Sequence, residues 1–250
     1  METLPERRSA LLPEAVRENN KEDQEAQEAR AMLTQAIRDI LARRREKLII
    51  LTQDKTGRLF SVANDLFEAC VANAGIVVTE EMRAQRQENK SLTYEPAEIP
   101  GLKIVSVRQI DMPSYVRDYD VDFAVIGEDA LDGDTEGLEV KRLGVGKSSL
   151  FFGVPKESSI TCPQDLVGKT IATSYKWALE KYLEDIGIKA NIIERAGKVE
   201  AAPGIGAADA ICDIVETGRS MKENNLRQLP QKIRNFQAVL ISKKPKSTGS

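Results

Sequence analysis

The first strong pattern of apolar and polar positions in the chain predicts one amphipathic helix. Between residues 26 and 45 the apolar side chains recur every three or four positions, and acidic residues come first. Arg43, Arg44 and Arg45 come last, where cations favour a helix C-terminus, and we interpret them as a solvated helix end rather than a nucleic-acid patch. Residues 1–24 are charged and lack a period, which predicts a loosely attached arm.

After this helix, short apolar runs alternate with helical periods, the pattern of a layered α/β fold. We predict strands at residues 48–51, 76–78, 102–107, 121–126, 150–154, 169–173, 190–194 and 237–241. We predict helices from about residue 59 to 75, after residue 111, from a Ser174 cap to 187, and around 207–215, and make no assignment for 79–100. The simplest architecture that fits these elements has an N-terminal arm and helix (1–46), two lobes (47–149 and 150–241) and a flexible tail (242–250). We expect a ligand cleft between the two lobes.

The composition limits the class of protein. The chain has 250 residues, 41% of them hydrophobic, which suffices for cores of ordinary size. A net charge of -3 and 5% aromatic residues do not favour a nucleic-acid surface. No run approaches the roughly 20 apolar residues of a membrane span, and the opening lacks a signal-peptide core, so we expect no membrane partner and a cytoplasmic location. Cys70, Cys162 and Cys212 lie far apart and are expected to be reduced structural thiols.

The chain contains no histidine, and this restricts its chemistry more than any other feature. Ser-His-Asp and Cys-His mechanisms, the common His-ligated zinc sites and imidazole acid-base catalysis are excluded within this chain. Any reaction must therefore use carboxylates, Arg, Lys, hydroxyls, backbone amides and Mg²⁺.

Two segments carry candidate chemistry. The first, residues 54–59, follows a strand and opens a helix, so Lys55, Gly57 and Arg58 are candidates for phosphate or pyrophosphate binding beside free amides. A solvated loop is at least as frequent an explanation of such a turn.

The second segment spans residues 198–226. Asp209 and Asp213 are four apart, which places them on one face of the predicted helix, where two carboxylates can bind ribose hydroxyls or Mg²⁺. A turn suited to a terminal phosphate follows them, made of Thr217, Gly218, Arg219 and Ser220. From the pattern alone, a surface helix with solvated acids and a glycine cap is equally probable.

The chain resembles the ATP phosphoribosyltransferase family over about residues 48–241. The motifs that carry this resemblance occur in the family's order: DKTGRL, VRQIDMPSYV, VDFAVIGEDAL, DLVGKTIATSY and, most specifically, VEAAPGIGAADAICDIVETG. The resemblance implies a two-lobed fold like that of type II periplasmic binding proteins. It also implies transfer of a phosphoribosyl group from phosphoribosyl pyrophosphate to N1 of ATP with Mg²⁺, the first step of histidine biosynthesis.

The resemblance also implies roles for particular residues. Asp213 would bind the ribose hydroxyls, and Thr217, Gly218 and Ser220 the 5′-phosphate. Arg58 would face the pyrophosphate or the triphosphate. Glu200, Asp209 and Asp129 receive support roles, and no metal ligand is assigned.

The chain departs from the family pattern in several places. Gly204 stands where the family has Arg, Ala207 where it has Leu, and residues 146–149 read Gly-Lys-Ser-Ser instead of Gly-x-Cys-Arg. Arg219 occupies the position of a small or hydroxyl residue, where it either adds a phosphate contact or fills the pocket. The helix at 26–45 is unusual for the family. It either replaces a helix that normally follows the last strand or is an arm packed elsewhere or used for oligomerisation.

Three functions therefore remain open: an ATP phosphoribosyltransferase, a divergent phosphoribosyltransferase with another heterocyclic acceptor, and a non-catalytic paralogue. For the first we expect ATP and phosphoribosyl pyrophosphate as substrates, an oligomer, and a separate regulatory subunit.

Overall fold

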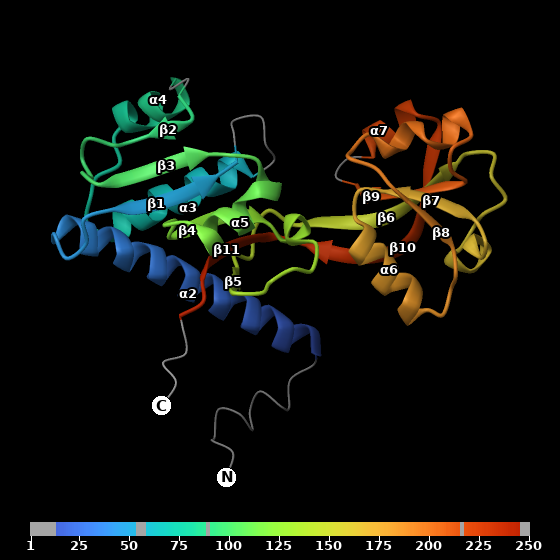
Figure 1. The fold of residues 1–250 in the computed structure, drawn as a ribbon, viewed down its shortest axis with the longest axis horizontal. Coiled ribbons are helices and arrows are strands. Elements are labelled where there is room, and N and C mark those ends of the chain that lie inside the picture. Colours follow the sequence, from blue (N-terminus) through green and yellow to red (C-terminus); the bar gives the residue numbers. More distant parts are fainter. Residues whose placement is uncertain (1–13, 54–58, 89–90, 216–217, 246–250) are drawn as a thin grey trace, which may run out of the picture. The chain divides into compact units, whose positions relative to one another are not determined.

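The computed structural model describes residues 14–53, 59–88, 91–215 and 218–245. The chain forms two compact units, each with its own mixed sheet (Figure 1). The first unit contains residues 1–130, 135–146 and 237–250, and the second contains 131–134 and 147–236. The predicted α/β class is confirmed, and the main division falls close to the predicted start of the second lobe.

The first unit is built on a six-stranded sheet in the order β2-β3-β1-β4-β11-β5. Strands β1, β3 and β4 are parallel, whereas β2 and β11 run antiparallel to their neighbours. The strands are β1 (Leu48–Thr52), β2 (Thr93–Tyr94), β3 (Leu102–Ser106), β4 (Phe123–Gly127), β5 (Leu138–Arg142) and β11 (Ala238–Lys243). Its helices are α2 (Glu14–Leu41), α3 (Phe60–Asn73), α4 (Glu80–Glu88) and α5 (Met112–Asp118).

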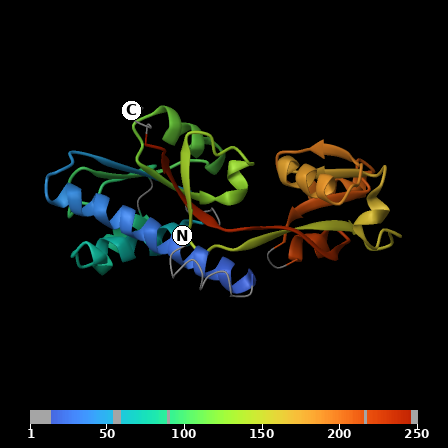
Figure 2. The ribbon, with the colours of Figure 1, turned by 90° about the horizontal axis from the view of Figure 1, so that it is seen from below.

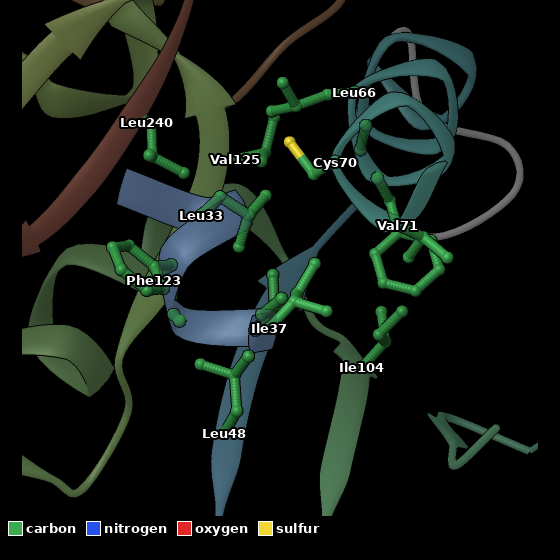
Figure 3. Packing of buried hydrophobic residues seen from close by; sticks show 14 of the residues in the cluster. Leu33, Ile37, Leu48, Leu66, Cys70, Val71, Ile104, Phe123, Val125 and Leu240 are labelled. Carbon is green, nitrogen blue, oxygen red and sulfur yellow. The ribbon is translucent and has the colours of Figure 1, made fainter. Parts of the chain in front are cut away.

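The core of the first unit depends on the amphipathic helix α2. Leu33 and Ile37 are buried, and they belong to the same apolar cluster as Leu48 of β1 and Cys70 of α3 (Figure 3). Figure 2 shows the helix lying along this unit. The apolar face of this segment therefore lies in the core of the first unit.

The ends of α2 differ from the prediction. The helix begins at Glu14, inside the predicted loose arm, because Glu, Gln, Ala, Lys and Arg are good helix formers even without an apolar face. It ends at Leu41, before the three arginines. Arg45 forms an ion pair with Asp122, whose second oxygen accepts the Ile49 N–H at 2.8 Å. Arg45 therefore joins the end of the helix to the sheet instead of being solvated.

Several other elements of the first unit differ from the prediction. Residues 76–78 form no strand, and the unassigned stretch contains α4 and β2. The strand predicted at 237–241 as part of the second lobe is β11, and it lies in the first sheet between β4 and β5. The strand β5 was not predicted, because LEVKR has only two apolar residues. Of the helices in the described part of the chain, none combines the length and apolar character that a bilayer span requires.

The second unit has a five-stranded sheet in the order β10-β6-β9-β7-β8. Strands β7, β8 and β9 are parallel, and β6 runs antiparallel to β9 and β10. The elements are β6 (Ser148–Pro155), β7 (Thr170–Thr173), α6 (Lys176–Asp185), β8 (Asn191–Glu194), β9 (Ala210–Ile214), α7 (Arg219–Glu223) and the unpredicted β10 (Leu226–Phe236).

Two different apolar layers cover the faces of this second sheet. Phe152 and Cys212 pack with α6 on one face, whereas Ile211 packs with Val199 and Met221 on the other. Figure 1 shows α6 and α7 on opposite sides of the sheet. Because side chains alternate along a strand, Asp213 lies on the same face as Ile211, the face that α7 covers.

Candidate active site

The candidate site lies at the carboxyl ends of the parallel strands of the second unit. These ends meet at one edge of a sheet, the usual place for a ligand in an α/β fold. Thr173, the last residue of β7, is fully buried, and its hydroxyl donates to the Cys212 carbonyl at 2.8 Å. This bond holds β9 beside β7 immediately before Asp213.

Asp213 is a half-buried carboxylate near the end of β9. It pairs with Phe151 of β6, and its Oδ1 accepts the Ile214 N–H at 2.8 Å. Burial raises the pKa of Asp213 from 3.8 to about 6, the Ile214 amide opposes this, and the charge of Glu200 adds to it. A carboxylate with a raised pKa beside a second carboxylate favours a cation or hydroxyl donors as its ligand.

Glu200 reaches this edge through a tightly held loop. The hydroxyl of Ser174, after β7, donates to the Arg195 carbonyl at 2.8 Å and accepts the Gly197 N–H at 3.0 Å. The short helical turn Val199–Ala201 follows, anchored by the buried Val199. Ser174 thus joins two loops and does not cap α6 as predicted, because α6 begins at Lys176 with Tyr175 before it.

The predicted phosphate turn leads into a short helix. Gly218 has a φ of +68°, a left-handed conformation that suits glycine, and α7 begins at the next residue. Ser220 is exposed in the first turn of α7. The Arg219 guanidinium pairs with Glu223 at 2.7 Å, and its side chain is 82% exposed. The alternative in which Arg219 fills the pocket is therefore wrong.

The helix predicted around residues 207–215 is wrong, because this segment forms strand β9. Asp209 lies just before the strand, where its Oδ2 accepts the Thr170 N–H at 2.8 Å. Four residues of strand separate it from Asp213 by about 13 Å, so the two carboxylates do not form one site. Asp209 holds the start of β7. The short, mostly apolar run AICDI is compatible with a buried strand as well as with a helix.

The remaining predicted residues divide into two groups. Asp129 lies in the first unit, in the turn Glu128–Leu131 after β4, where the neighbouring Glu128 pairs with Arg142 at 2.9 Å. Lys55, Gly57, Arg58 and Thr217 lie outside the described residues. Their assigned roles stay predictions.

The cysteines fit the structural role predicted for them. All three are free thiols, and Cys70 and Cys212 are buried. Burial raises the pKa of both buried thiols, which keeps them protonated and unreactive.

The side chains at the carboxyl edge of the second sheet offer few ligands for a metal ion. Among the described residues, no three His, Cys, Asp or Glu side chains gather closely enough to bind a metal by themselves. Mg²⁺, however, is usually bound by one or two carboxylates together with substrate phosphates. Asp213 and Glu200 therefore fit a Mg²⁺ ion that arrives with a phosphorylated substrate.

Comparison of the structure with solved structures gives the fold class, and comparison of the sequence then gives the family. The chain resembles a substrate-binding protein of an amino acid ABC transporter with a TM-score of 0.50, covering 80% of this chain and 87% of that chain at 15% identity. This is the two-unit fold of type II periplasmic binding proteins. The sequence comparison then decides between the members of the class: the chain belongs to the ATP phosphoribosyltransferase family, whose sequence model matches residues 108–249, more than half of its length.

Individual relatives agree with this assignment. An ATP phosphoribosyltransferase of Cytophaga hutchinsonii is 38% identical over 179 residues, which cover 71% of this chain and 58% of the relative. The chain in the ATP phosphoribosyl transferase (HisG:HisZ) complex from Thermotoga maritima is similar in structure, with a TM-score of 0.57, 26% identity, and coverage of 78% of this chain and 87% of that chain. The matches span about three fifths of the length of the curated relatives.

Proposed function

We propose that this chain transfers the phosphoribosyl group of phosphoribosyl pyrophosphate to N1 of ATP and releases pyrophosphate, the first step of histidine biosynthesis. One observation carries the proposal. In the most specific family segment, Glu200 lies close enough to raise the pKa of Asp213 near the end of β9, and Gly218 lies in the turn immediately before α7, which supports a ribose-phosphate site at the carboxyl edge of the second sheet.

Asp213 is the residue that would bind the ribose. Its carboxylate is ionised at neutral pH and accepts hydrogen bonds from the ribose hydroxyls, which fixes the anomeric carbon relative to the acceptor. The turn at Gly218 and the hydroxyl of Ser220 would bind the 5′-phosphate. Glu200 keeps the local charge negative, so a ribosyl substrate carrying Mg²⁺ is preferred over a free anion.

The reaction needs no strong base, in agreement with a chain that has no histidine. The N1 lone pair of adenine forms the new bond to the anomeric carbon while the bond from that carbon to the pyrophosphate oxygen breaks, and pyrophosphate leaves with the electron pair. When bound, Mg²⁺ supplies charge neutralisation of that pyrophosphate. The role predicted for Lys55 and Arg58 is to stabilise the same charge.

Two further parts of the proposal concern partners. The similar Thermotoga maritima protein is described as a HisG:HisZ complex. We propose that this chain likewise assembles with a separate regulatory chain and acts as part of an oligomer. A cytoplasmic location stays a prediction.

The test is the rate of pyrophosphate release from phosphoribosyl pyrophosphate and Mg²⁺, measured with ATP, without an acceptor, and with a panel of other heterocycles. We expect release to depend on ATP and to fall sharply in the Asp213→Asn variant. Release with another heterocycle but not with ATP contradicts the acceptor. Absence of binding of phosphoribosyl pyrophosphate at millimolar concentration contradicts the whole proposal, because enzyme substrates ordinarily bind between about 1 µM and 1 mM.

A further inference from the structure

A pocket without an assigned role lies in the first unit, between α3, α4 and the edge strand β2 (Figure 1). Phe67 of α3, Val78, Met82 of α4 and Tyr94 of β2 give it apolar walls. The described residues that line it all belong to the first unit, whereas the candidate active site lies in the second. Apolar walls of this kind are suited to the hydrocarbon or aromatic part of a small molecule.

Asn64 of α3 gives this pocket one specific polar group. Its side-chain oxygen Oδ1 is buried, and among the described residues it has no hydrogen-bond partner. Such an acceptor is unfavourable in a folded protein, because it has lost its hydrogen bonds to water and gained none in return. A ligand that donates one O–H or N–H group to Asn64 removes this cost.

The two charged residues that line the pocket neutralise each other. The Arg83 guanidinium of α4 pairs with the Glu68 carboxylate of α3, with Nε and Oε2 3.0 Å apart. Glu80 also pairs with Arg83, but its side chain is 90% exposed and does not line the pocket. No cation in the pocket is therefore left for an anionic ligand, and burying a charge without a partner is costly, so the pocket favours a neutral molecule.

Met82 is the wall of the pocket that can move. The free space is about 30 Å³, which suffices for a water-sized group but not for a ring. Of the α4 side chains that the structure describes, that of Met82 alone is buried, and a methionine side chain adapts its shape easily. The Thr79 hydroxyl accepts the Met82 N–H at 3.2 Å and holds the backbone of this turn. A ring can therefore enter when the Met82 thioether rotates away, while α4 stays folded.

We propose that this pocket binds a small neutral molecule with an aromatic ring and one O–H or N–H group. The ring takes the place of the Met82 thioether against Phe67 and Tyr94, and the O–H or N–H group donates to Asn64 Oδ1. A hydrocarbon ring leaves Asn64 without a partner, and a charged ligand meets no free charge of opposite sign. This site does not depend on the proposed transfer reaction.

Phenol and toluene are suitable probes, because they have nearly the same size and differ by one O–H group. Benzoate adds a negative charge to the same ring. The chain has five methionines, so ¹³C-methyl labelling gives few signals, and the Met82→Leu variant identifies the one in the pocket. We expect phenol and toluene to shift the Met82 signal saturably, and benzoate at the same concentrations to leave it in place. The signal of Met221 in the second unit should not move.

The Asn64→Leu variant removes the acceptor at nearly constant size. Phenol leaves water less readily than toluene, so the informative quantity is the ratio of their two affinities, compared between parent and variant. We expect the affinity for phenol relative to toluene to fall about tenfold in Asn64→Leu, because phenol loses its hydrogen bond. The matched control, Asn73→Leu, makes the same change at an exposed position of the same helix and should leave the ratio unchanged.

The Met82→Ala variant tests the movable wall. It leaves open the space that the thioether fills, so phenol and toluene should both bind more tightly, as measured from the broadening of the ligand signals. Unchanged Met112 and Met221 signals show that the variant is folded, and Met82→Val replaces it if they change. Each of these results overturns the site: no saturable shift of Met82 with phenol, the same affinity ratio in the parent and in Asn64→Leu, or no tighter binding when Met82 is shortened.

A last variant separates this site from the proposed active site. Asp213→Asn should weaken phosphoribosyl pyrophosphate binding and leave the phenol-induced shift of Met82 unchanged. If saturating phosphoribosyl pyrophosphate abolishes that shift in the parent protein, the two compounds compete for one site and the separate pocket is refuted. If phenol binds as expected while no phosphoribosyl pyrophosphate binds, the proposed function fails and this site stands.

Discussion

Replacing Asp213 by Asn should weaken ligand binding and strengthen the fold at the same time. Folding raises the pKa of this carboxyl from 3.8 to about 6, mainly through burial. The protonated form is therefore favoured in the folded protein, so the stability that Asp213 contributes is present below pH 3.8 and is lost as the pH rises to about 6. Above that pH, the buried charge is a net cost to folding.

The magnitude follows from the size of this change in pKa. One pKa unit corresponds to about 1.4 kcal/mol, so the upper bound is about 3 kcal/mol. Partial exposure to solvent reduces this to about 1 to 2 kcal/mol for the free energy of unfolding. Asn is uncharged and keeps an oxygen that can accept the Ile214 N–H. We therefore expect the variant to be more stable than the parent at pH 7.5 and equally stable near pH 4.

Ligand binding should change in the opposite direction. A charge-assisted hydrogen bond is worth about 1.5 to 3 kcal/mol, so the affinity for phosphoribosyl pyrophosphate should fall roughly tenfold or more. In the parent, this affinity should decrease as the pH falls below about 6, and in the variant this part of the pH dependence should disappear.

Urea unfolding and calorimetric titration between pH 4 and 8 measure both effects. Asp209→Asn is the matched control, since it makes the same substitution just before the same strand but about 13 Å away, and it should leave ligand affinity unchanged. If the Asp213→Asn variant is less stable than the parent at pH 7.5, or if the parent binds equally well at pH 5 and 7.5, burial of the Asp213 charge is not the governing effect.

Three further predictions concern other parts of the chain. Ile37→Ala should lower the free energy of unfolding by about 2 to 5 kcal/mol in urea denaturation, and deletion of residues 1–46 by more, whereas Gln27→Ala on the exposed face should have little effect. A thiol reagent should modify only Cys162 in the folded protein and all three cysteines in urea, and rapid native modification of Cys212 would contradict its burial. Arg58→Ala should reduce turnover more than affinity for phosphoribosyl pyrophosphate in steady-state kinetics and calorimetry, because the departing pyrophosphate gains charge in the transition state. Full turnover would show that Arg58 has no part in the reaction.

Local patterns in the sequence were sufficient to predict helices with a single apolar face and strands that are continuously apolar. The amphipathic stripe of α2 has one apolar face, and strands such as β1 and β7 are short, continuous apolar runs, so their type follows from periodicity alone. The ordered family motifs carried the proposed function, and they made Asp213 and Gly218 candidate site residues although the secondary structure predicted around Asp213 was wrong.

Tertiary structure decided what depends on partners distant in the sequence. The run AICDI has an apolar pattern compatible with a helix, and only the neighbours β6 and β7 make it a strand, which moves Asp209 away from Asp213. Ser174 holds the loop that leads to Glu200 because β7 and β8 end side by side, a contact that no local spacing indicates. Likewise, β11 lies in the first sheet because the backbone N–H and C=O groups along the buried strand β4 need a hydrogen-bonding partner. The position of β11 therefore depends on a strand that is distant in the sequence.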